Sequence, residues 1–193
     1  MIFGVAGIPA NYKGRFDKIF DWLREMKLNA FEIQCTYGFK ISEANKAVFN
    51  RERENGMNLS MHAPYYINFA NPSDEMAEKS YNYVLNSCKK VAMLGGERVI
   101  FHPASVGKMQ RADAVALTHK RIETLVDRIY QNGMQDFTFC PETMGKINQI
   151  GDLAEVVDFC KIDKCLVPTV DFGHLNARTY GSIRTKDDYE RLI

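Results

Sequence analysis

Short apolar runs alternate with segments of helical periodicity along the whole chain of 193 residues. An alternation of this kind is typical of βα units that build a parallel sheet. The sequence therefore predicts an α/β fold with about six βα units. The expected strands are 2–5, 29–33, 59–61, 98–101, 137–142 and 166–170.

Capping residues and glycines mark where the helices between these strands should begin and end. Phe16, Ile19, Phe20, Leu23 and Met26 follow helical spacing in the first helix. The later helices are expected from Ser42 to Gly56, from Ser73 to Gly95, across Val115 to Ile129, from Asp152 to Cys160, and after Thr185.

Eight βα units form a closed TIM (β/α)8 barrel of about 250 residues. With about six units, residues 1–193 are expected to form a single but incomplete TIM barrel domain of a chain truncated at its C-terminal end. An open doubly wound sheet is the competing architecture. The barrel is preferred because acidic and histidine residues follow at least four of the strands, where barrel enzymes build their sites.

Composition narrows the class of protein. With 46% hydrophobic and 25% charged residues, the chain has material for one core. No apolar run approaches the roughly 18 residues of a membrane span, and the start lacks a signal peptide, so a cytoplasmic protein without a membrane partner is expected. Five scattered cysteines without a Cys-x-x-Cys pair indicate reduced thiols. A net charge of +1 argues against a protein that coats nucleic acid.

Potential metal ligands follow each of the last four expected strands. They are His62, His102, Glu142, Asp171 and His174. The carboxyl ends of barrel strands converge on one mouth, so these side chains can meet. Imidazole and carboxylate suit zinc, manganese or iron, and one carboxylate can bridge two ions. Three of the chain's 4 histidines occupy such positions. His119 is the exception, because it is expected in mid-helix with a structural or exposed role.

Two of these ligands are followed by distinctive segments. Tyr65 and Tyr66, three and four residues after His62, are unusually aromatic for a solvated loop. In Asp171-Phe-Gly-His174, Gly173 is expected to turn the backbone sharply, so that the histidine faces the mouth before a polar loop at 175–181.

The successive motifs His-Ala-Pro-Tyr-Tyr-Ile-Asn, Phe-His-Pro, Pro-Glu-Thr-Met-Gly and Val-Asp-Phe-Gly-His-Leu-Asn-Ala resemble those of the endonuclease IV family of apurinic/apyrimidinic endonucleases, from His62 to Gly181. The resemblance implies a xylose isomerase-like TIM barrel that cleaves the phosphodiester 5′ to abasic sites in DNA, with up to three zinc ions. It implies one zinc on His62 and His102, with Glu142 as the bridging, catalytic carboxylate. Asp171 would share the second zinc with Glu142, and His174 would bind the third.

By the same resemblance, Tyr65 and Tyr66 would enter abasic duplex DNA. Basic residues in the loops at the expected mouth also suit a polyanion, namely Lys13, Arg15, Lys108, Arg111, Lys146, Arg178 and Arg184. Two departures stand out. The loop at 34–38 lacks the arginine that bacterial members use to probe the helix, and the 19 residues after His174 contain no histidine. By the resemblance, further ligands would lie on two later strands that these 193 residues do not include. Residues 1–193 by themselves would then bind fewer ions and lack nuclease activity.

Two other classes remain open. A sugar isomerase or epimerase of the same barrel group would use strand-end glutamate, aspartate and histidine around a single divalent ion. A non-catalytic barrel that binds a metal or small ligand would need only the Asp171 and His174 region. His62 together with His102 favours the multi-zinc site. The open edges of the strands at 2–5 and 166–170 also predict self-association.

Overall fold

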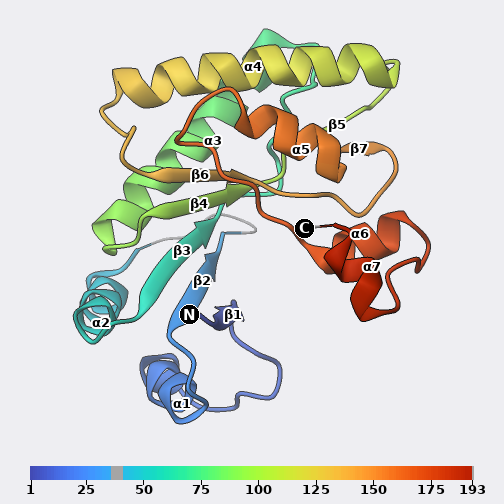
Figure 1. Cartoon of the computed structure of the whole chain (residues 1–193). Coiled ribbons are helices and arrows are strands. Elements are labelled where there is room, and N and C mark those ends of the chain that lie inside the picture. The colour runs from blue at the N-terminus through green and yellow to red at the C-terminus, as the bar shows by residue number, and fades with distance from the viewer. Residues whose placement is uncertain (36–40, 193) are drawn as a thin grey trace.

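A parallel sheet organises the chain (Figure 1). The computed structural model describes residues 1–35 and 41–192. Within these residues the sheet has five strands in the order β1-β2-β3-β4-β6, and every neighbouring pair is parallel. The strands are β1 (Gly4–Ala6), β2 (Ala30–Gln34), β3 (Asn58–His62), β4 (Arg98–Phe101) and β6 (Thr138–Pro141). The α/β prediction is confirmed.

The sixth expected strand, at 166–170, follows β6 in parallel but through two isolated bridges, Phe139 to Leu166 and Glu142 to Thr169. The Val167 amide donates to the Phe139 carbonyl at 3.0 Å, and the Thr169 amide donates to the Pro141 carbonyl at 3.0 Å. Between these bonds the ladder requires an amide at position 141. Proline has no N–H, so the ladder breaks there and the continuous strand that we expected is replaced by two bridges.

Helices α1 (Ile19–Glu25), α2 (Glu43–Glu54), α3 (Asp74–Met93), α4 (Arg111–Gln131) and α5 (Leu153–Cys160) connect the strands, with a short 3-10 helix η1 (Phe16–Lys18) before α1. The caps lie where the sequence predicted them. The Ser42 hydroxyl accepts from the Asn45 amide at 3.1 Å, and Ser73 accepts from the Met76 amide at 3.4 Å. Asp152 forms a capping box with Glu155, which fixes the start of α5.

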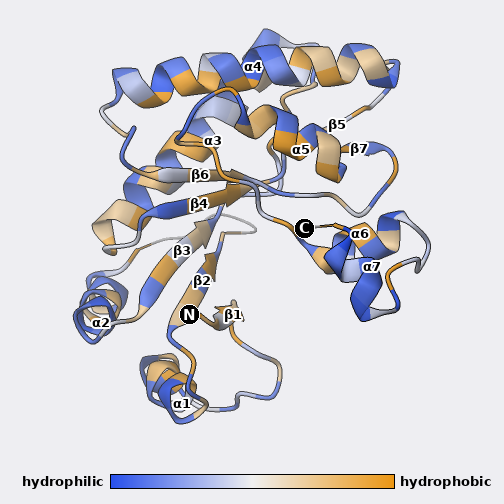
Figure 2. Ribbon diagram, in the orientation of Figure 1, coloured by the Kyte–Doolittle hydropathy of each residue, from blue (hydrophilic) through white to orange (hydrophobic). Residues whose placement is uncertain are grey.

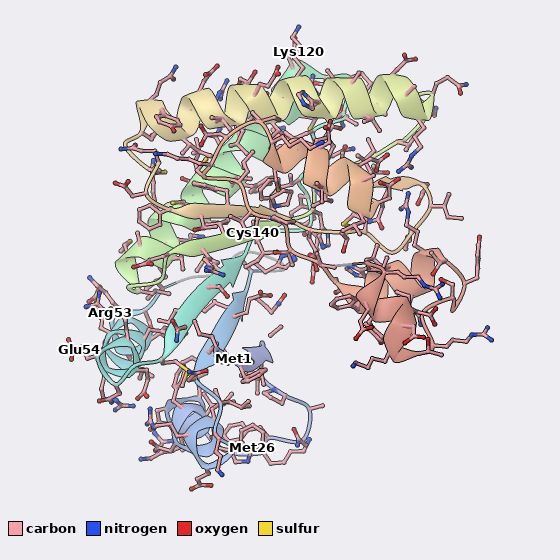
Figure 3. The ribbon with its side chains drawn as sticks, in the orientation of Figure 1. Met1, Met26, Arg53, Glu54, Lys120 and Cys140 are labelled. Atoms are coloured by element: carbon pink, nitrogen blue, oxygen red, sulfur yellow. The ribbon has the colours of Figure 1, made fainter. Side chains whose placement is uncertain are left out.

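The core lies between the sheet and these helices. Along α4, apolar and polar residues alternate around the helix (Figure 2), and the apolar side is buried against the sheet through residues such as Ile122, Leu125 and Ile129. Figure 3 shows the two kinds of environment, with Lys120 on the outer side of α4 and Cys140 near the middle of the sheet. His119 of α4 is only partly exposed and lies toward α5, where it pairs with Asp158 as well as with Glu123 of its own helix, as expected for a structural residue.

The region after 170 differs from the prediction. Residues 175–178, expected to lie in a polar loop, instead belong to the helix α6 (Phe172–Arg178). Asp171 is its N-cap and accepts from the His174 amide at 2.7 Å. Gly173 therefore lies in the first turn of a helix rather than at a sharp bend, which corrects our expectation. Helix α7 (Lys186–Glu190) follows, capped by Thr185 as predicted.

A small antiparallel pair that the sequence did not reveal, β5 (Ala104–Ser105) with β7 (Gln149–Ile150), joins the segments after β4 and β6. The arrowheads of β2, β3, β4 and β6 point toward the centre of Figure 1, with α6 and α7 to their right. In the described part of the chain, no helix is long and apolar enough to cross a membrane.

Candidate metal centre

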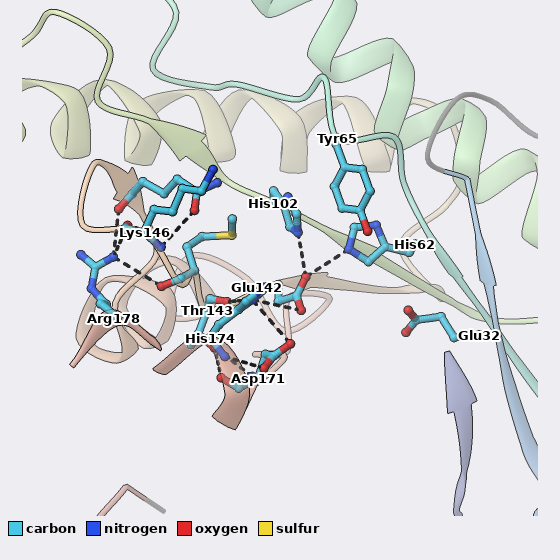
Figure 4. A network of polar contacts seen from close by, with 12 residues as sticks. Glu32, His62, Tyr65, His102, Glu142, Thr143, Lys146, Asp171, His174 and Arg178 are labelled. Carbon is cyan, nitrogen blue, oxygen red and sulfur yellow. Dashed lines mark hydrogen bonds and ion pairs between the residues drawn. The ribbon is translucent and has the colours of Figure 1, made fainter. Parts of the chain in front are cut away.

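Three of the predicted ligands meet at the carboxyl ends of β3, β4 and β6 (Figure 4). His62 is the last residue of β3, His102 follows β4, and Glu142 follows β6. The Glu142 Oε2 atom lies 3.1 Å from Nε2 of His62 and 3.1 Å from Nε2 of His102. The parallel register brings them together, because the Glu142 amide donates to the Phe101 carbonyl at 3.0 Å and so continues the β4–β6 pairing by one step.

The ring of His62 is oriented by its backbone. Its Nδ1 atom lies 2.7 Å from the Ala63 carbonyl oxygen, to which it donates. Nε2 is therefore the nitrogen that faces the Glu142 carboxylate. Without a cation between them, Nε2 must carry a proton to hydrogen-bond to that oxygen, whereas with a metal ion its lone pair becomes a ligand.

The electrostatics agree with a charged pair. Burial lowers the pKa of His62, but its hydrogen bonds with Glu142 and the Ala63 carbonyl outweigh this effect, so the pKa lies above 6.5. Burial likewise raises the pKa of Glu142, but hydrogen bonds from His102 and His62 and their charges lower it from 4.5 to about 2. The protein alone therefore holds Glu142 as a carboxylate that attracts cations.

A second ligand group shares Glu142. Its members are Glu142, Asp171 and His174, whose ligand atoms lie within 4.8 Å of one another. Nδ1 of His174 is 3.7 Å from Glu142 Oε1 and 3.5 Å from Asp171 Oδ2. The two oxygens of Glu142 thus face different partners, Oε2 the histidines of β3 and β4, and Oε1 the histidine of α6.

Thr143 orients this second group. Its hydroxyl accepts from the Asp171 amide at 2.8 Å, and its carbonyl lies 2.8 Å from Nδ1 of His174. That contact makes Nδ1 the protonated nitrogen and leaves the lone pair of the ring on Nε2. Gly145 lies close to His174, because a Cβ added there would stand 3.2 Å from Cδ2 of the imidazole ring.

The two tyrosines predicted to contact DNA occupy different places. Tyr65 covers the metal centre, because its ring centroid is 5.0 Å from that of His62 and 4.8 Å from that of His102. The Tyr66 ring instead lies against Tyr83 of α3 at 6.1 Å. Both side chains are about half exposed, at 46% and 55%. The structure thus places Tyr65, but not Tyr66, over the candidate ligands.

The loop that carries Tyr65 is anchored from behind by Arg121 of α4. This arginine is buried, and it donates to the Phe69 carbonyl at 3.1 Å, to the Asn71 carbonyl, and to Asp74 at 3.2 Å. Buried backbone carbonyls need such donors. Arg121 therefore holds the loop in the shape that brings Tyr65 onto the histidines.

The predicted basic face is only partly available. Arg111 is 2.7 Å from Glu155 and donates to the Ile147 carbonyl at 2.9 Å, and Arg178 donates to the Lys146 carbonyl at 2.8 Å. These two arginines support neighbouring loops rather than present free cations. The lack of an arginine at 34–38 falls mostly on residues outside the described part of the chain.

One acidic residue near the centre was missed. Glu32 of β2 lies beside His62 in Figure 4 and interacts electrostatically with His62, Glu142 and Asp171. Its strand was predicted correctly, but Glu32 lies within the strand, whereas the predicted ligands all follow strands. Its alternation with the apolar Phe31 and Ile33 was the available signal.

The donor set fits a metal centre. It combines imidazole nitrogens with carboxylate oxygens, which suit zinc and related ions. His62 and Glu142 are buried, and both histidines facing Glu142 need either protons or a cation to do so. The fold and the site together are those of an α/β barrel that carries two groups of potential metal ligands at the carboxyl ends of its strands.

The chain belongs to the xylose isomerase-like TIM barrel family, and the model of that family matches residues 20–193. The sequence is 28% identical to an uncharacterized protein of Methanocaldococcus jannaschii over 100% of this chain and 69% of that protein. It is 28% identical to a probable endonuclease 4 of Halothermothrix orenii over 97% of this chain and 70% of the relative. The suspected relation to endonuclease IV is confirmed at this level.

Other relatives are matched over a smaller part of their length. An apurinic-apyrimidinic endonuclease of Caenorhabditis elegans is 29% identical, and the match covers 68% of this chain and 33% of that protein.

Among solved structures, a D-psicose 3-epimerase from Clostridium cellulolyticum has a TM-score of 0.75 at 12% identity, and the match covers 100% of this chain and 70% of that one. Endonuclease IV from Thermus thermophilus has a TM-score of 0.60 at 20% identity, covering 93% and 70%. At these identities the structures establish the barrel fold.

Proposed function

We propose that this chain carries part of the zinc centre of an endonuclease IV-like hydrolase, which cleaves the phosphodiester 5′ to abasic sites in DNA. The observation that carries the proposal is the shared position of Glu142, which belongs to one ligand group with His62 and His102 and to another with Asp171 and His174. A carboxylate between two ligand groups is the arrangement that bridges two ions. We also propose a cytoplasmic location, which suits the five cysteines, all of them free thiols.

The residues have distinct roles in this proposal. His62, His102 and Glu142 would hold one ion, and Glu142, Asp171 and His174 would hold a second. Bound zinc lowers the pKa of a water molecule toward neutrality and offsets negative charge on the phosphate oxygens. The Ala63 and Thr143 carbonyls fix the ring orientations of His62 and His174, and Tyr65 shields the two histidines from solvent and stacks where a base is absent.

Metal content tests the centre directly. Protein purified without chelator should contain zinc, and Glu142→Gln and His102→Ala should each lower the zinc content, as measured by elemental analysis. His119→Ala is the matched control, because His119 lies between α4 and α5 and belongs to neither ligand group. Zinc at background level in the wild type, unchanged in the two variants, would contradict the proposed centre.

A sugar isomerase or epimerase is the second candidate. It is favoured by one observation, namely that Glu142, Asp171 and His174 form a complete ligand group without the two histidines of β3 and β4. A single divalent ion on this group would suffice to bind adjacent oxygens of a sugar. Incubation with ketohexoses and Mn²⁺, followed by chromatography, distinguishes the two reactions. Epimerised product together with intact abasic DNA would replace the hydrolase proposal.

A further inference from the structure

Glu32 and Gln34 of β2 line the candidate metal centre from a strand that supplies no ligand to it. In the β2–β3 register Gln34 pairs with His62, and Glu32 pairs with Ser60. Paired residues of parallel strands, and alternate residues of one strand, point to the same face of a sheet. Glu32 and Gln34 therefore share the face of His62. Figure 4 shows the Glu32 carboxylate near His62, directed toward the side where Glu142 and Asp171 lie.

A short chain of hydrogen bonds fixes the Glu32 carboxylate. Gln34 Nε2 donates to Glu32 Oε1 at 2.6 Å, and the Tyr65 hydroxyl donates to Gln34 Oε1 at 3.5 Å. The amide of Gln34 is thereby oriented, with its oxygen toward Tyr65 and its nitrogen toward Glu32. Among the described residues, the Glu32 Oε2 atom has no hydrogen-bond or ion-pair partner. Glu32 also stands outside both ligand groups.

The chemistry of this oxygen restricts what it can bind. A half-buried carboxylate accepts hydrogen bonds and repels anions, so a phosphate group does not suit it. Burial raises the pKa of Glu32 above 4.5, although the charge of His62 acts in the opposite direction, and the charge of Glu142 raises it further. A hydroxyl group held next to the metal-binding residues is the complementary ligand.

We propose that Glu32, positioned by Gln34, accepts a hydrogen bond from a sugar hydroxyl of the substrate and so selects ligands that carry one. This inference rests on the proposed function. Two sources supply the same chemistry. One is an abasic deoxyribose in DNA, which carries a hydroxyl at C1′ where a base would be attached, and the other is a free ketose.

The test compares zinc-loaded wild-type protein with Glu32→Gln and with Glu97→Gln. Glu97 is an exposed glutamate that directly precedes β4, at the opposite end of the strands from the centre, and is the matched control. Binding is measured by fluorescence anisotropy with two duplexes that contain a non-hydrolysable linkage 5′ to the lesion. One carries a natural abasic residue, and the other carries a tetrahydrofuran residue that lacks the C1′ hydroxyl. A ketohexose is titrated by calorimetry in a parallel arm.

Wild-type protein should prefer the natural abasic duplex over the tetrahydrofuran duplex, or should bind the ketohexose. Glu32→Gln should weaken binding of the hydroxyl-bearing ligand about tenfold, the range of a hydrogen bond to a charged group, and leave tetrahydrofuran binding unchanged. Gln34→Ala should give a smaller loss in the same direction. Glu97→Gln should match the wild type.

The outcomes separate the inference from the proposed function. If wild type and Glu32→Gln discriminate equally between the two duplexes and bind the ketohexose equally, the role of Glu32 is refuted while the zinc centre stands. If the wild type binds neither duplex nor the ketohexose, the proposed function fails and the inference fails with it. Preference for the abasic duplex alone identifies DNA as the source of the hydroxyl, and ketohexose binding alone identifies a free sugar.

Discussion

Glu142 and His62 illustrate how a single buried pair can serve both stability and function. With metal absent, the pair is charged, and each partner shifts the pKa of the other. The lowered pKa of Glu142 contributes stability that is complete above 4.5 and is lost as the pH falls toward about 2. The raised pKa of His62 contributes stability that is complete below 6.5 and is lost as the pH rises through its folded value.

We therefore expect metal-free protein to gain most from this pair between pH 4.5 and 6.5. Thermal unfolding followed by circular dichroism across this range should show Glu142→Gln less stable by on the order of 2–3 kcal/mol. The difference should shrink toward pH 2. His119→Gln, which changes an exposed ion pair, should show little effect. A constant difference between wild type and Glu142→Gln at all pH values would contradict the assignment.

The two tyrosines after His62 should behave differently despite their adjacent positions. Tyr65 lies over His62 and His102, whereas Tyr66 lies against Tyr83. Tyr65→Ala is expected to weaken binding to abasic duplex by roughly 1–3 kcal/mol, the value of one stacked aromatic ring. Tyr66→Ala, the matched control, should bind within a factor of two or so of wild type. Anisotropy titrations measure both, and equal losses would show that the packing of Tyr65 on the histidines is irrelevant to DNA.

At the scale of elements, a buried carboxylate joins the first two helices. Glu52 of α2 is fully buried and is paired with Arg24 of α1 and with Arg51, the latter at 2.8 Å. Glu52→Ala removes charge-assisted hydrogen bonds at a fully buried position, while Arg24 and Arg51, with side chains 38% and 55% exposed, stay in contact with water. The substitution is therefore expected to destabilise the protein by about 1.5–3 kcal/mol in urea unfolding. Glu54→Ala, an exposed neighbour on the same helix, should change stability by less than about 0.5 kcal/mol.

Most of these elements could be predicted from the sequence because local signals agreed with the fold. The strand at 98–101 and the caps Ser42 and Ser73 are examples. Helix α6 was missed because Asp171-Phe-Gly-His174 contains a glycine and precedes hydrogen-bonding residues, which favoured a loop. The same aspartate is a good N-cap, and that signal was available.

Part of the candidate site could likewise be predicted from the sequence, and part of it could not. The five expected ligands fall into two groups that share Glu142, because parallel strands bring their ends together whatever their separation in sequence. Glu32 could not be found from strand ends, since its place at the centre depends on the register between β2 and β3. Register follows from tertiary pairing, which a local pattern does not specify.

At the scale of the whole molecule, the sheet is open at β1. In the described residues this strand pairs only with β2, and the preceding Ile2 and Phe3 are 58% and 57% exposed. Exposed apolar strand edges recruit other chains. We expect the 193-residue chain to self-associate, with a mass above 22.1 kDa by light scattering.

A charge placed at this edge should oppose that association. Phe3→Lys is expected to shift the chain toward monomer, whereas Met26→Lys, at the similarly exposed C-cap residue of α1, should leave association unchanged. A wild-type chain that stays monomeric over a wide concentration range would rule out pairing through β1. Association of Phe3→Lys at wild-type strength would show that another surface is responsible.

The missing amide of Pro141 has a mechanical consequence. His62, His102 and Glu142 stand on strands joined by a continuous ladder, whereas Asp171 and His174 follow a segment that is tied to β6 by two separate bridges. The backbone before Asp171 and His174 is therefore held by fewer hydrogen bonds to the sheet than the strands that lead to His62, His102 and Glu142. Because Glu142 stands at the boundary, we expect its distance to Asp171 to vary more with the size of a bound ion than its distances to His62 and His102.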